Sequence, residues 1–62
     1  MTKTEAERLW RRDELPAVRA RYERDGRRDE PARAESWSAF TDALCKAGRI
    51  SIRQYESWTT PR

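Results

Sequence analysis

The chain of 62 residues has no histidine and only one cysteine, Cys45. A disulfide within the chain is therefore excluded, and so is a zinc site built from cysteine and histidine. Thiol catalysis at Cys45 would lack its usual histidine base. A chain this short also offers no obvious cleft in which a carboxylate could be desolvated for acid–base chemistry. We therefore predict no catalytic residue, no metal site and no cofactor.

Long apolar runs are absent as well, because charged residues interrupt the first twenty positions every few residues. This pattern excludes a signal peptide and a membrane span. A single cysteine is typical of a reducing compartment. We expect a cytoplasmic protein without membrane contact.

Neither sign of charge dominates, since 14 basic residues face 11 acidic ones and give a net charge of +3. The mixed charge argues against a DNA mimic, which needs a strongly acidic surface. Three tryptophans, two tyrosines and a phenylalanine favour an ordered chain over a disordered one. A domain of this size buries only about 60% of its unfolded surface, so we expect it to bind a larger partner or to form a homodimer.

Helix signals begin near the N-terminus, where Thr4 and Glu7 have the spacing of a capping box. They predict a helix over 4–12. Pro16 disfavours helix at the residue before it and fits the first turn of a second helix, predicted over 16–25. Pairs of opposite charge four residues apart are expected to flank these helices: Glu7 with Arg11, Arg19 with Glu23, and Arg21 with Asp25.

The second half of the chain contains the clearest helical periodicity, which predicts a helix over 31–46. A capping box at Ser51 predicts a last helix over 52–58, followed by a frayed tail over 59–62. Glycines are expected to end the second and third helices: Gly26 and Gly48.

We therefore predict an all-α fold, a single domain over 1–62 built as a small bundle of three to four short helices with a C-terminal αα-hairpin. The stretch between Glu35 and Trp58 is predicted to be the only one able to nucleate the core. The expected scaffold residues are Trp37, Phe40, Leu44, Ile50, Ile52 and Tyr55.

Candidate partner-binding residues are arginines and tryptophans, the types that dominate binding hot spots. Arginines gather in two stretches, and two tryptophans lie near the ends of predicted helices. The alternative is that the arginines form a solvated surface with nearby carboxylates and that the tryptophans only cap the core. The candidates are Trp10, Arg11, Arg12, Arg24, Arg27, Arg28 and Trp58.

The C-terminal corner could also be a DNA-binding helix-turn-helix motif. Of the first residues of its last helix, only Arg53 and Gln54 are good readers of base edges. That helix is barely two turns long, and Ile52, Tyr55 and Trp58 are expected to face the core. The competing interpretation is that this corner only supports the fold and does not contact DNA.

Several segments together resemble a family of small proteins encoded on bacterial phages, plasmids and integrative elements. The similarity spans nearly the whole chain, and the segments that carry it are Glu5–Trp10, Glu14–Arg19, Tyr22–Glu23, Glu35–Trp37, Thr41–Ser51 and Gln54–Trp58. The resemblance implies a mobile genetic element in a bacterial host, but it assigns no role to any residue. Short proteins of such elements often bind host machinery, and anti-CRISPR proteins are a prominent class.

Three hypotheses follow for function. The first is a non-enzymatic protein-binding module that inhibits or modulates a host protein or ribonucleoprotein complex, most specifically a CRISPR effector complex. The second is a small regulator that binds DNA or RNA through its last helix or its arginine clusters. The third is a structural module whose fold closes only on self-association.

Overall fold

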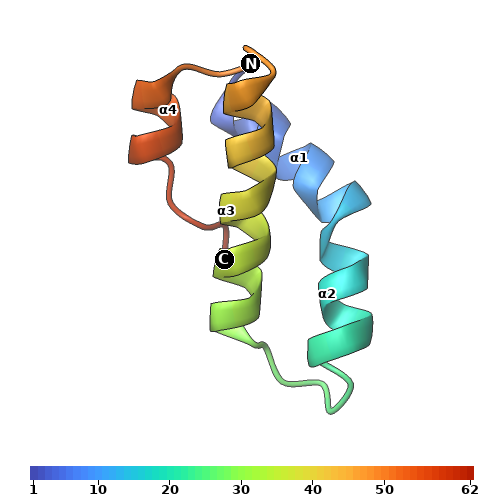
Figure 1. Cartoon of the computed structure of the whole chain (residues 1–62). Helices are drawn as coiled ribbons and strands as arrows, with labels where there is room; N and C mark the ends of the chain where they lie inside the picture. The colour runs from blue at the N-terminus through green and yellow to red at the C-terminus, as the bar shows by residue number, and fades with distance from the viewer.

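Four helices and no strand make up the chain in the computed structural model, which describes residues 1–62. The helices are α1 (Lys3–Asp13), α2 (Leu15–Tyr22), α3 (Glu30–Lys46) and α4 (Ile52–Ser57). The predicted all-α class is confirmed. Figure 1 shows the long α3 in the middle, with α1 and α2 as a bent arm on one side and α4 on the other. No helix combines the length and the apolar composition needed to cross a membrane.

The first helix begins at Lys3, and its cap lies two residues before the predicted one. Thr2, not Thr4, is the N-cap residue, because its hydroxyl accepts a hydrogen bond from the backbone N–H of Glu5 at 3.2 Å. The Glu5 carboxylate in turn accepts from the backbone N–H of Thr2. Both threonines have a glutamate three residues later, and the earlier box moves the cap two residues toward the N-terminus. The predicted pair of Glu7 with Arg11 is also wrong, since Glu7 pairs with Lys3 at 3.8 Å.

The break between the first two helices lies at Glu14, and Leu15, which Pro16 is expected to keep out of a helix, is the first residue of α2. Glu14 is at once the C-cap of α1 and the N-cap of α2, and Pro16 occupies the first turn of α2. The end of α2 differs from the prediction, because the helix stops at Tyr22 and Gly26 lies in the following turn with φ +81°. The carboxylate of Glu23 is held by groups outside the helix, as described below.

Both ends of α3 follow from its sequence. Asp29 caps the start by accepting a hydrogen bond from the backbone N–H of Ala32 at 3.0 Å. At the other end the N–H groups of Gly48 and Arg49 donate to the carbonyls of Cys45 and Leu44, respectively. This is a Schellman motif, and Gly48 supplies its positive φ of +75°.

The connection from Gly48 leads directly into α4, which packs against α3 as the predicted αα-hairpin. Ser51 and Gln54 form the predicted capping box, with reciprocal hydrogen bonds at 3.0 and 2.8 Å. Ile50 is buried, as expected. Ile52 is 68% exposed, so its predicted place in the core is wrong. It is the first residue of a short helix, and the packed side of that helix is occupied by Tyr55 and Trp58, both half-buried.

The core lies mainly between α1, α2 and α3, which corrects the expectation that residues 35–58 alone would form it. Its central contact joins Trp10 of α1 to Trp37 of α3, with ring centroids 5.7 Å apart in an edge-to-face arrangement. Phe40, Leu44 and Trp58 pack against this cluster from the side of α3 and α4. The buried apolar members are Ala6, Trp10, Leu15, Val18 and Trp37. The N-terminal half therefore supplies most of the buried apolar residues.

Candidate partner-binding site

A buried ion pair joins the C-cap residue of α2 to α3. The guanidinium of Arg33 donates from Nε and Nη2 to the two carboxylate oxygens of Glu23, at 2.7 and 2.8 Å. The backbone N–H of Asp29 donates to the same carboxylate at 3.0 Å. The side chains of Arg33 and Glu23 are only 8% and 6% exposed. This bidentate geometry is the strong form of an arginine–carboxylate contact.

The contacts around Glu23 shift the acidity of both partners. Hydrogen bonds from the Arg33 guanidinium and from the Asp29 backbone lower the pKa of Glu23 to about 2. The hydrogen bond to Glu23 raises the pKa of Arg33 above its ordinary value. The pair is therefore fully charged at neutral pH, and Glu23 is not available to a sequence-local arginine. The predicted pair of Arg19 with Glu23 is replaced by this longer-range one.

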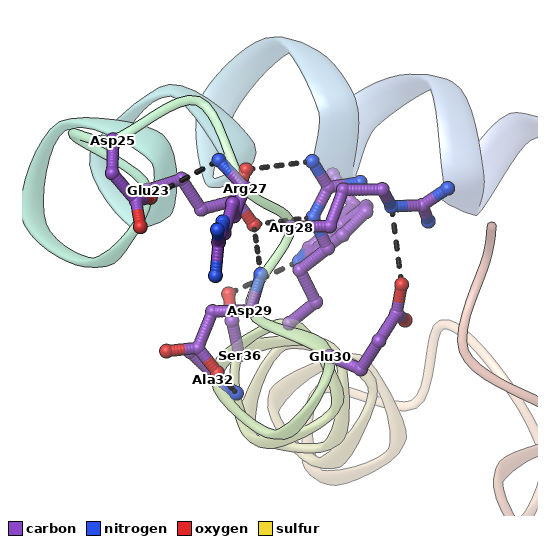
Figure 2. Close-up of polar contacts among 10 residues, drawn as sticks. Glu23, Asp25, Arg27, Arg28, Asp29, Glu30, Ala32 and Ser36 are labelled. Atoms are coloured by element: carbon purple, nitrogen blue, oxygen red, sulfur yellow. Dashed lines mark hydrogen bonds and ion pairs between the residues drawn. The ribbon is translucent and has the colours of Figure 1, made fainter.

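Hydrogen bonds also fix the loop between α2 and α3. The Asp25 carboxylate accepts from the backbone N–H of Arg27 at 3.0 Å, so it is not paired with Arg21 as predicted. Arg24 folds back and donates to the carbonyl of Ala20. Arg28 pairs with Glu30 at 3.1 Å (Figure 2). Three further predicted contact residues thus lie in one ordered loop: Arg24, Arg27 and Arg28.

Beside this loop the surface is hollowed into a groove of about 550 Å³. Arginines line it from both helices of the N-terminal arm, from the loop, from α3 and from the end of the chain. We call it the arginine groove, defined by Arg11, Arg19, Arg28, Arg33, Arg62 and the single acidic side chain Glu23.

The arginine groove carries an excess of positive charge. Its only acidic side chain, Glu23, is already satisfied by Arg33 and by the Asp29 backbone. Arg11 donates to the main-chain oxygen of Arg62 at 3.1 Å, which joins the first helix to the last residue. Arg28 pairs with Glu30, and Arg33 with Glu23, whereas no acidic side chain pairs with Arg11 or Arg19. Guanidinium groups without such a partner can hold carboxylates or phosphates in bidentate geometry. The groove is therefore suited to an anionic ligand.

The structure brings together two of the predicted contact residues, Arg11 and Arg28, in the arginine groove. Arg12 is directed to its neighbour Asp13, with Nε 2.7 Å from the carboxylate, and does not line the groove. Arg24 and Arg27 lie outside the groove lining as well. Sequence reasoning missed three of its members: Arg19, Arg33 and Arg62.

A sequence signal for part of the groove does exist. Arg11, Leu15, Arg19 and Glu23 recur every four residues through the junction of α1 and α2, and all of them line the groove. Such spacing places side chains on one face when the helical path continues. Arg33 and Arg62 carry no such signal, because only the packing of α3 and of the chain end brings them to this face.

The two predicted contact tryptophans have different environments. Trp10 is only 1% exposed and its indole N–H donates to the Ser36 hydroxyl at 3.1 Å. The expectation that Trp10 is available for a partner is therefore wrong, because α1 turns this side chain onto α3. Trp58 is half-buried at the end of α4 and remains partly accessible.

The described side chains contain no cluster of three or more metal-ligating residues. Cys45 is half-buried and free. Comparisons with protein-family models, with curated proteins and with solved structures found no match for this chain.

Proposed function

We propose that this chain is a non-enzymatic binding module that docks its arginine groove onto an acidic surface of a larger host complex. The observation that carries the proposal is the groove itself, where guanidinium groups from five segments converge around one already neutralised carboxylate. Binding there would block or lock the partner by occupying its surface. No bond-making chemistry is part of this function.

The lining of the groove favours a protein surface over a nucleic acid. Single-stranded nucleic acids are usually held by aromatic side chains that stack on the bases, and Leu15 is the only apolar residue that lines the groove. Recognition of duplex DNA usually uses a helix in the major groove, whereas α4 has only six residues. These two features support carboxylates as the anions that the groove receives.

For the identity of the complex, the resemblance to small proteins of phages and other mobile elements supports bacterial host machinery. We propose a CRISPR effector complex as its most specific target, with the chain acting as an anti-CRISPR inhibitor. This part rests on that resemblance and on the size of the chain. The arginine groove supports only the type of contact, which is between guanidinium groups and anions.

The test is recovery of a host complex by the tagged chain, with and without nuclease treatment of the lysate. We expect a stoichiometric complex that survives nuclease. A variant with Arg11→Gln and Arg19→Gln should bind the purified complex at least about tenfold more weakly, since each lost hot-spot arginine costs more than about 1 kcal/mol. Binding should be measured by calorimetry.

The matched control carries Arg49→Gln and Arg53→Gln, which remove the same charge from exposed positions outside the groove. It should bind like the parent chain. Equal binding by the groove variant would refute the contact assignment. Recovery that depends on intact nucleic acid would instead support the nucleic-acid regulator.

A further inference from the structure

A second hollow, of about 490 Å³, lies between α3 and the segment formed by α4 and the residues after it. Three aromatic side chains line it: Trp37 from α3, Tyr55 from α4, and Trp58 from the end of α4. Two polar residues, Glu56 and Thr59, also line it. We call this the aromatic hollow.

The charge of the aromatic hollow is opposite to that of the arginine groove. Glu56 is its only ionised lining residue, and no lysine or arginine lines it although the chain has 14 basic residues. Glu56 makes no ion pair in the structure, whereas five other carboxylates do. The hollow therefore presents aromatic rings and one free carboxylate.

Two lysines of the chain lie near this region, and each already has an acidic partner. Lys3 donates to the Thr59 hydroxyl at 3.2 Å and pairs with Glu7 at 3.8 Å. Lys46 pairs with Asp42 at 2.9 Å. Neither lysine lines the hollow, so its negative charge is left for a cation from outside.

Aromatic faces attract cations through their quadrupole, most strongly in tryptophan, and a nearby carboxylate adds direct attraction. A primary ammonium also has three N–H donors, and the two carboxylate oxygens of Glu56 can accept hydrogen bonds from them. A quaternary ammonium cannot use these acceptors. The apolar stem of a lysine side chain would pack along the rings of Tyr55 and Trp58.

We propose that the aromatic hollow receives a lysine side chain of the protein partner. The residues after α4 separate this hollow from the arginine groove: Thr59 lines one, Arg62 lines the other, and Pro61 between them is buried. The matching partner surface therefore has a lysine next to an acidic patch. The inference rests on the proposed protein partner. The placement of the lysine beside an acidic patch also rests on the proposed docking of the arginine groove, whereas the preference of the hollow for an ammonium group does not.

The test uses the isolated chain and n-butylammonium, which reproduces a lysine side chain. The readout is the indole N–H signal of each tryptophan in a two-dimensional ¹H–¹⁵N spectrum. Trp37 and Trp58 are the reporters because both side chains line the hollow. We expect saturable shifts of Trp37 and Trp58. Trp10 does not line the hollow and touches it only through its packing on Trp37, so its shift should be smaller.

The substitution Glu56→Gln should weaken this binding by about threefold, as loss of an exposed ion pair predicts. Glu35→Gln is the matched control, since it removes an exposed carboxylate from α3 that does not line the hollow. An unchanged Trp10 signal will show that both variants are folded.

Equal shifts with n-butanol, the neutral analogue, would overturn the proposal, because the hollow would then be merely apolar. Equal affinity of the parent and Glu56→Gln would overturn it as well. Tighter binding of choline than of n-butylammonium would replace the lysine with a quaternary ammonium ligand. These probes test only the aromatic hollow. If n-butylammonium did not bind, the proposed docking of the arginine groove would remain unaffected.

Discussion

At the scale of single residues, the Glu23–Arg33 pair does most to shape the candidate site. Glu23 ends α2, neutralises the buried Arg33 and holds the backbone of Asp29, so one carboxylate fixes the loop and one wall of the groove. A buried guanidinium is costly unless it is paired, which makes the pair sensitive to the loss of either partner.

This pair predicts how stability depends on pH. The folded-state pKa of Glu23 is lowered from 4.5 to about 2, so its contribution is complete above pH 4.5 and is lost as the pH falls toward 2. We expect the melting temperature of the parent chain to fall over this window. The lowered pKa values of Glu5 and Asp13 act in the same direction.

Glu23→Gln should flatten the pH dependence and lower the melting temperature by several degrees at pH 7, because Arg33 loses its ionic partner. Thermal unfolding followed by circular dichroism would measure both effects. Glu35→Gln, whose carboxylate has no ion pair, should retain the parent profile. If the melting temperature of Glu23→Gln fell with pH as steeply as that of the parent chain, this explanation would be contradicted.

At the scale of elements, local chemistry at the helix ends predicts most boundaries. Proline, capping side chains and a glycine with positive φ act on the backbone next to them, so they can be recognised in the sequence. The observed helix boundaries that they predict lie at Pro16, Asp29, Gly48 and Ser51. The first cap was misplaced because two overlapping boxes satisfy the same rule. The predicted end of α2 lies too far along the chain, because the carboxylate of Glu23 pairs with Arg33 of α3 and not with Arg19 of the same helix.

The Schellman motif at the end of α3 yields a direct test. A Cβ at Gly48 would meet no atom within 4 Å, so any effect of Gly48→Ala comes from the positive φ of +75° alone. We expect a loss of about 1 kcal/mol in the free energy of unfolding, measured by denaturant titration. Gly48→Asn should lose less, since asparagine tolerates this conformation. An unchanged stability of Gly48→Ala would show that the turn rearranges freely.

At the scale of the whole molecule, residues distant in sequence close the structure. Gln54 donates to the carbonyl of Met1, Lys3 to Thr59, and Arg11 to the carbonyl of Arg62, so both ends of the chain lie along the bundle. The molecule measures 36 × 18 × 17 Å, and its core is completed within one chain.

This closure predicts that folding does not require a second copy of the chain. Helicity by circular dichroism should stay constant on dilution from about 100 to about 1 µM, because a fold that closes only on self-association would unfold by mass action. Analytical ultracentrifugation should show a monomer at the same concentrations. Loss of helicity on dilution would favour the self-associating module instead.

The sequence by itself determined the all-α class and nearly all helix positions, because periodicity and caps act within a few residues. It also identified Arg11 and Arg28 as contact candidates, because charge and local composition are visible without a fold. Only the tertiary structure decided that Trp10 is buried and Ile52 exposed, and that Arg33 and Arg62 complete the groove. The reason is physical: burial and convergence depend on how separate helices pack against one another, and no local pattern encodes that packing.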